Sequence, residues 1–337
     1  MKFTNLKIYY TLIFSNNLWF ITSNWLNFWL KFMTMKEVGI IDAVAFLTGI
    51  LIEFPSGVIS DRLGRKQTLL ISQSLQLLGS LIITLSTNLF EIGLGFVLFQ
   101  IGVSFYSGTI ESFGYEAAIK EKFEYSNVLV LSGIFSNFSY LISLLIGGYL
   151  YTQNDNYPNI LFTLNFIVGF LSVLFIKEVP VLQEKESKIF LKSKFNLYTV
   201  ISFVVLMTVV FAFDYGFLKL FILDKFSTIY DNYWYIFSAT LLSLFISSLI
   251  LKRIQKINKT LIILFIILTI SFLLSFISYV IPFFILSFLA VFVYQLSLKY
   301  INEKIEDSYR ASVISLFNLV YKLPYVLIAL ILGYNLA

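Results

Sequence analysis

Residues Gly57 to Lys66 form a short charged segment whose residue types suit reversible ion pairing rather than covalent chemistry. Asp61 supplies a carboxylate acceptor, while Arg62 and Arg65 supply guanidinium donors. Charged residues make up only 13% of the chain, against 58% hydrophobic residues, so this concentration needs a physical reason. Either the segment makes and breaks an electrostatic contact with another part of the protein, or its cations only fix the side of a membrane on which the turn lies.

Polar side chains also interrupt the apolar segments. Acids within a membrane are costly and usually functional, which singles out Glu111 and Asp214 as proton carriers or substrate contacts. The candidate residues of a substrate or proton pathway are Asn17, Asn24, Glu53, Gln100, Glu111, Asp214, Gln295 and Lys322. For the amides, interhelical hydrogen bonding is the alternative role. The aromatic content of 18% suits an apolar or cationic substrate, and it equally suits aromatic belts in lipid.

Lys322 lies in the middle of an apolar helix, where an unpaired ammonium costs about 3 kcal/mol on insertion scales. We therefore expect Lys322 to pair with Glu53 or Asp42 across the contact between two helix bundles, and to change partner during a working cycle. The alternative is that its side chain extends toward a membrane surface.

The composition excludes several kinds of chemistry. The chain has no cysteine and no histidine, so disulfides, thiol catalysis, histidine proton relays and the usual metal sites are absent. No cofactor is expected, and the apolar sequence shows no nucleophile–base pair of a lipid-modifying enzyme. The net charge of +5 does not indicate nucleic-acid binding, because the basic residues fall in alternate loops between apolar segments.

The apolar segments predict an all-α polytopic membrane protein, since about 20 apolar residues span a bilayer as a helix. We expect about eleven transmembrane helices, at residues 8–31, 38–60, 67–86, 91–116, 126–151, 157–176, 196–221, 232–252, 260–278, 280–301 and 309–334. A polar linker at residues 177–195 divides them into a six-helix bundle (1–176) and a five-helix bundle (196–337). With a cytoplasmic N-terminus, 19 of the 24 basic residues lie on the inner side, which predicts that orientation in a plasma membrane and an outer C-terminus.

The charged segment resembles a signature of the major facilitator superfamily, approximately G-x-x-x-D-R-x-G-R-K. The residues that match it are Gly57, Asp61, Arg62, Gly64, Arg65 and Lys66. Gly57 is expected to allow close approach of a neighbouring helix. The resemblance implies that Asp61 contacts the start of the helix near Arg310 as an inner latch. It also implies that Glu116 meets Arg65 or Arg62, and that the first, fourth, seventh and tenth helices line the substrate path.

The chain also departs from the family pattern. Leu98 stands where many members have an arginine linked to proton coupling, and Gly147 and Gly148 remain of a helix-5 signature without its proline. A twelfth helix is not found. The segment from Glu53 to Gly57 resembles permeases often assigned to efflux.

The sequence therefore predicts a monomeric secondary transporter that exports a small organic solute by alternating access, with protons as the candidate driving ions. Nutrient uptake is one alternative. A shortened, non-transporting regulator or immunity protein is the other.

Overall fold

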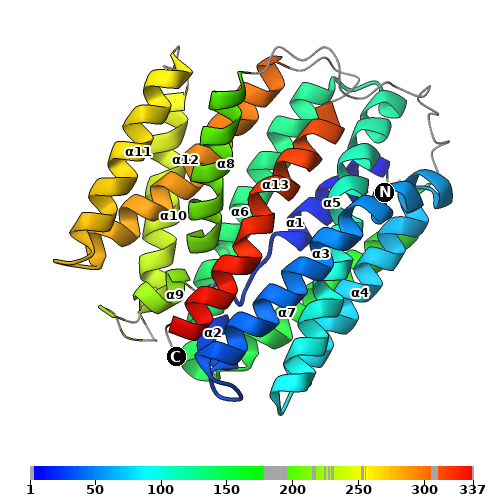
Figure 1. Cartoon of the computed structure of the whole chain (residues 1–337). Helices are drawn as coiled ribbons and strands as arrows, with labels where there is room; N and C mark the ends of the chain where they lie inside the picture. Colours follow the sequence, from blue (N-terminus) through cyan, green and yellow to red (C-terminus); the bar gives the residue numbers. More distant parts are fainter. Residues whose placement is uncertain are drawn as a thin grey trace. The chain divides into compact units, whose positions relative to one another are not determined.

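The computed structural model contains only α-helices as regular structure in the residues that it describes (Figure 1). These residues are 4–177, 196–214, 218–223, 225–226, 228, 231–251, 254, 256–304 and 310–335. The chain divides into two compact units. The N-terminal unit comprises Met1–Gln183 with Gly333–Ala337, and the C-terminal unit comprises Glu184–Leu332. The linker predicted at residues 177–195 lies, apart from Lys177, outside the described residues.

The N-terminal unit contains the first seven helices. They are α1 (Asn5–Asn16), α2 (Trp25–Trp29), α3 (Met35–Leu63), α4 (Arg65–Leu85), α5 (Leu89–Glu121), α6 (Tyr125–Gln153) and α7 (Tyr157–Leu174). Helix α5 packs against α4 and α3, and α7 packs against α4 and α1. The α4–α5 contact depends on small residues, because a methyl group on Gly102 would lie 2.8 Å from the backbone nitrogen of Gln76.

The C-terminal unit is built from the later helices of the chain, most of which pack around one central helix. They are α8 (Leu197–Asp214), α9 (Leu218–Leu223), α10 (Asn232–Leu251), α11 (Ile257–Leu274), α12 (Val280–Lys304) and α13 (Arg310–Asn335), whose last residues fall in the N-terminal unit. Helix α12 is the central element, since it contacts α8, α9, α10 and α11. Helices α11 and α12 confirm the two helices predicted at residues 260–278 and 280–301, and they pack against each other as a hairpin.

The predicted continuous helix over residues 8–31 is wrong, because α1 ends at Asn16 and α2 begins at Trp25. Side chains terminate α1 by bonding its last carbonyl groups. The Nδ2 atom of Asn17 donates to the Ile13 oxygen at 2.7 Å, and the Trp19 indole donates to the Asn16 oxygen at 2.8 Å. These donors satisfy carbonyls that the next helical turn would otherwise bond.

The predicted helix over residues 196–221 is represented by two described helices, α8 and α9. The other nine predicted helices are found within a few residues of their predicted ends.

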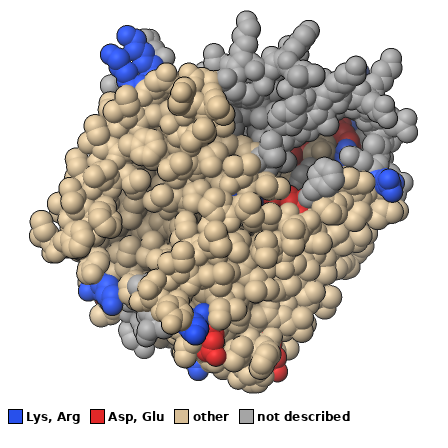
Figure 2. Space-filling model, in the orientation of Figure 1, with Lys and Arg blue, Asp and Glu red and all other residues tan. Residues whose placement is uncertain are grey.

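Seven of the described helices are long and apolar enough to cross a membrane by length and composition. They are α4, α5, α6, α7, α8, α11 and α12, in whole or in part. In Figure 2, charged side chains appear in few places, with broad areas of other residues between them. Surfaces of this kind favour contact with lipid over contact with water.

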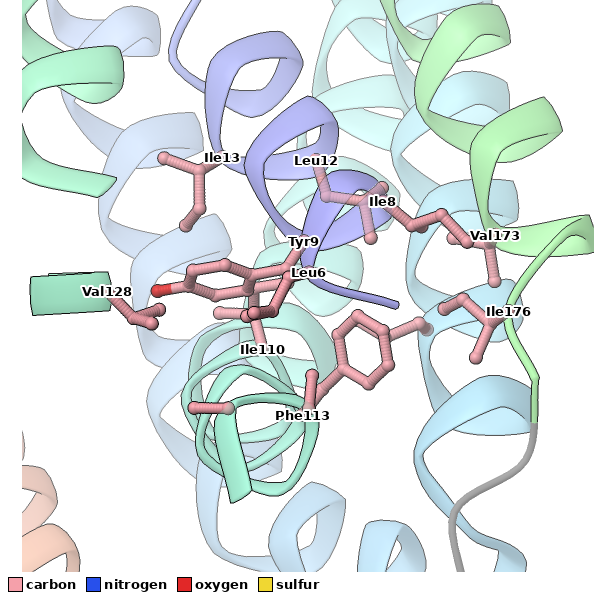
Figure 3. Packing of buried hydrophobic residues seen from close by; sticks show 13 residues of the cluster. Leu6, Ile8, Tyr9, Leu12, Ile13, Ile110, Phe113, Val128, Val173 and Ile176 are labelled. Carbon is pink, nitrogen blue, oxygen red and sulfur yellow. The ribbon is translucent and has the colours of Figure 1, made fainter. Parts of the chain in front are cut away.

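A buried apolar cluster joins α1, α5, α6 and α7 (Figure 3). Tyr9 lies at its centre and is fully buried. Gly114 on α5 makes room for this ring, because a methyl group there would lie 2.8 Å from the Tyr9 Cζ atom. The Tyr9 hydroxyl points toward Val128 on α6.

Candidate functional site: a charged turn and intramembrane acids

The charged turn is built around Gly64, the single residue that ends α3 and precedes α4. Its φ of 89° and ψ of 162° lie in a region that is open essentially to glycine alone. The Gly64 carbonyl accepts a hydrogen bond from the Thr68 hydroxyl at 2.9 Å, which stabilises the first turn of α4. The glycine of the sequence motif therefore has a conformational role.

Arg65, the first residue of α4, joins three helices at this turn. Its Nε donates to Glu116 Oε1 on α5 at 3.0 Å, and its Nη1 donates to the Ser60 hydroxyl on α3 at 2.8 Å. The Glu116 side chain is 4% exposed and that of Arg65 is 12% exposed. The predicted contact of Glu116 with the basic residues of the motif is present, and Arg65 provides it.

Lys66 extends the same network to a fourth helix. Its Nζ donates to the Leu174 carbonyl at the end of α7 at 2.9 Å, where a cation complements the helix dipole. At the neighbouring end of α1, Glu121 Oε1 accepts from the Leu6 backbone nitrogen at 2.9 Å. The motif thus holds together one end of the N-terminal unit.

The structure describes the remaining residues of the predicted gate only in part. Arg62 is exposed, and the side chains of Asp61 and Arg310 lie outside the described residues. Helix α13 is described from Arg310 onward, and the latch between Asp61 and Arg310 stays a prediction. The expectation that Gly57 permits a close helix approach is not met within its own unit, where a methyl group on Gly57 would have no atom within 4 Å.

Two buried polar residues of α5, Gln100 and Ser104, lie where α5 packs against α3. The Ser104 hydroxyl donates to the Gly49 carbonyl at 2.8 Å, and the Ser56 hydroxyl donates to the Ser104 carbonyl at 3.0 Å. Gln100 is buried in the same contact and lies against Gly49. This location favours helix packing as the role of Gln100, while its predicted role in a substrate path stays a prediction.

The break between α1 and α2 is held by contacts from three other helices. Asn16 and Gln73 on α4 exchange amide hydrogen bonds, the closer of which is 3.1 Å. Asn165 on α7 donates to the Ser15 carbonyl. On α6, Gly147 lies so close to the break that a methyl group would be 2.8 Å from the Phe20 carbonyl carbon.

Asn17 and Asn24 therefore lie in non-helical backbone. Asn24 is buried, and its Nδ2 atom has no hydrogen-bond partner among the described residues. Non-helical backbone at membrane depth is tolerated only where protein or water surrounds it.

Asp214 has a cationic partner that the sequence analysis missed. The Lys219 Nζ on α9 lies 2.6 Å from Asp214 Oδ1 at the end of α8. The Lys219 side chain is only 5% exposed, so the two charges neutralise each other within the C-terminal unit. A lysine five residues from an acid in an apolar segment was the available signal, because a buried ammonium requires a partner.

Glu111 differs from Asp214 because it makes no ion pair in the part of the chain that the structure describes. Its Oε2 atom accepts a hydrogen bond from the Tyr125 hydroxyl on α6 at 3.3 Å, and the Glu111 side chain is exposed. Tyr9 and Tyr106 lie near enough to interact electrostatically with it. A carboxylate surrounded by tyrosines can accept a proton or bind a cation.

The family model described as "Major Facilitator Superfamily" matches residues 9–329. The chain belongs to this superfamily. It is thus a multi-pass membrane protein and a secondary transporter, not an enzyme.

Solved structures of superfamily transporters share its fold. A mutant of the nucleoside transporter NupG superposes with a TM-score of 0.75 at 12% identity, over 98% of this chain and 90% of that chain. A D-xylose-proton symporter gives 0.70 at 11% identity, over 97% and 88%. A bacterial homologue of the human lysosomal transporter Spinster, in an inward-facing and unoccupied conformation, gives 0.64 at 13% identity, over 95% and 78%. Curated protein sequences include no significant match.

Three further residues that the sequence analysis predicted for the pathway make no ion pair that decides their role. Glu53 and Gln295 are half-buried, on α3 and α12. Lys322 is half-buried on α13 and makes no ion pair with a described side chain of its own unit. Its predicted pairing with Glu53 or Asp42 joins the two units, which are described separately, and stays a prediction.

Proposed function

We propose that this protein exports a small organic solute by alternating access, with protons as the driving ions and Glu111 as the residue that exchanges them. The protein is proposed to act as a monomer in the plasma membrane, with a cytoplasmic N-terminus and an outer C-terminus. The network of Arg65 and Glu116 then lies at the inner side. The latch between Asp61 and the start of α13 at Arg310 biases which side is open.

The single observation that supports proton coupling is the contrast between two acids in the apolar helices. Asp214 is neutralised by Lys219 at 2.6 Å, whereas Glu111 has a tyrosine hydroxyl and no cation among the described residues. A carboxylate in the membrane interior costs about 3 kcal/mol on insertion scales, so a lasting negative charge at Glu111 is unfavourable. Protonation or binding of a cation relieves this cost, which makes Glu111 the natural exchange site.

We prefer export over uptake because the segment from Glu53 to Gly57 resembles efflux permeases. The D-xylose-proton symporter and the nucleoside transporter with a similar fold are too distant in sequence to decide direction. Nutrient uptake through the same site is the second candidate. A regulator that moves no solute is the third.

Flux in proteoliposomes tests the proposal. Purified full-length protein is reconstituted with a pH-sensitive dye inside, and a panel of small organic compounds is added with and without a pH gradient. We expect at least one compound to drive proton movement in the opposite direction to its own. Movement of both in the same direction would support uptake, and absence of any compound-dependent flux would support a regulator.

Glu111→Gln separates coupling from folding in the same assay. This variant is expected to move no protons, and any solute flux that it retains should not respond to the pH gradient. Glu91→Gln, at the other end of α5, is the matched control and should behave as the wild type. Normal proton movement in Glu111→Gln would remove Glu111 from the proposal.

A further inference from the structure

Aromatic rings from three helices lie near the exposed carboxylate of Glu111. Tyr125 on α6 donates to its carboxylate, and the Tyr115 ring on α5 lies edge-on to the Tyr125 ring with centroids 5.1 Å apart. Tyr9 on α1 and Tyr106 on α5 are close enough to interact with its charge. These contacts all lie within the N-terminal unit, so they do not depend on the other half of the protein.

The ring system continues from Tyr9 along α1. Tyr10 lies 5.4 Å from Tyr9 and 5.5 Å from Phe135 on α6, measured between ring centroids. Phe14, one turn further along α1, lies edge-on to the same Phe135 at 6.5 Å. A row of rings therefore extends along α1 from Tyr9 to Phe14.

The cluster contains a buried polar atom that lacks a partner. The Tyr106 hydroxyl is buried and has no hydrogen-bond partner among the described residues. A buried hydroxyl without a partner is unfavourable, because it has lost its hydrogen bonds to water. A ligand with N–H donors would satisfy this oxygen, and the same donors would suit the Glu111 carboxylate.

We propose that Glu111, Tyr106 and Tyr125 bind the ammonium group of a protonated organic amine, whose apolar body packs along the partly exposed rings of Tyr10 and Phe135. This assignment deepens the proposed transport function and rests on it for its physiological meaning. An anion is disfavoured because the site carries a carboxylate and no described cation. A neutral ligand leaves the carboxylate charge uncompensated. A cation over a tyrosine face is attracted by the negative charge of the ring face, in addition to its interaction with the carboxylate.

Matched probes test the class of ligand directly. Binding of 2-(1-naphthyl)ethylamine, 2-(1-naphthyl)ethanol and 1-naphthylacetate is measured by equilibrium dialysis against the purified full-length protein. The three share an aromatic body and differ in charge. We expect the amine to bind about tenfold or more tightly than the alcohol, and the acid to bind most weakly.

Variants locate the site. Glu111→Gln should reduce amine affinity about tenfold or more and leave alcohol affinity unchanged, because only the charge is removed. Tyr125→Phe, which removes the hydrogen bond to the carboxylate, should reduce amine affinity by a few-fold. Glu91→Gln is the control acid on the same helix and should bind the amine as the wild type does.

The outcomes distinguish this inference from the transport proposal. Equal binding of amine and alcohol by the wild type, or no binding of either, overturns the amine site. Unchanged amine affinity in Glu111→Gln overturns it as well. If the amine binds through Glu111 but proteoliposomes show no flux, the amine site stands and the transport proposal fails. If flux requires Glu111 but the amine binds no more tightly than the alcohol, the transport proposal stands and the amine site is overturned.

Discussion

Arg65 Nε lies 3.0 Å from Glu116 Oε1, so the first residue of α4 is bonded to a buried acid near the end of α5. Because Arg65 also donates to Ser60 on α3, this one side chain ties α3, α4 and α5 together at the charged turn. The ends of three helices are thus held as one body, which is what a rigid half of a rocking transporter requires.

Removing either partner of this pair should destabilise the protein strongly. Glu116→Ala leaves the guanidinium without its carboxylate in a largely buried position, and breaking such a pair costs about 3–5 kcal/mol. The free energy of unfolding is followed by titration with sodium dodecyl sulfate. Arg65→Ala and the double variant complete the cycle, and losses that simply add would show that the two side chains do not interact.

Two glycines of the motif should respond differently to the same change. Gly64→Ala forces a Cβ into backbone angles of φ 89° and ψ 162°, which costs about 1–3 kcal/mol. Gly57→Ala places a methyl group where no atom lies within 4 Å, so its unfolding free energy should change by about 0.5 kcal/mol or less. The same detergent titration measures both variants, and equal effects would contradict the conformational role of Gly64.

The break in the first membrane segment should depend on Gly147. Gly147→Ala would drive its methyl group into the Phe20 carbonyl, and overpacking of this kind costs about 1–3 kcal/mol. Gly133→Ala on the same helix meets no atom within 4 Å and should be neutral or stabilising. A Gly147→Ala protein as stable as Gly133→Ala would show that the break does not contact α6.

The buried pair in the C-terminal unit should show compensation between two substitutions. Lys219→Met alone leaves Asp214 without its cation, and Asp214→Asn alone leaves Lys219 unpaired, so each should cost about 3 kcal/mol. The double variant, neutral at both positions, should be more stable than either single variant in thermal unfolding. A double variant less stable than both would mean that the two residues act independently.

The sequence predicted most of the fold because helices in a bilayer have few alternatives. Residues 260–298 are too long for one span and too apolar to leave the membrane, so the hairpin of α11 and α12 followed from length alone. The break after Asn16 could not be read in this way. Its cause is a set of hydrogen bonds from Asn17 and Trp19, together with a glycine more than one hundred residues away.

The candidate site was only partly predictable. The motif indicated that Glu116 would meet a basic residue, and the structure selects Arg65 for this contact. The acids Glu111 and Asp214 were equivalent in the sequence, because each is an acid in an apolar run. Only the fold shows that Lys219 neutralises one of them and that tyrosines from α1, α5 and α6 surround the other.

The absence of cysteine allows a direct test of alternating access, since introduced cysteines are the only sites for spin labels. One labelled pair is Arg62→Cys at the end of α3 with Lys259→Cys in the first turn of α11, both on the inner side in the predicted topology. The second pair is Thr87→Cys before α5 with Ser278→Cys between α11 and α12, both on the outer side in that topology. Distances within each pair are measured by double electron–electron resonance at acidic and at alkaline pH. We expect the two distances to change in opposite directions with pH, and Glu111→Gln to remain in the acidic arrangement. Distances that do not change, or that both increase together, would contradict the account.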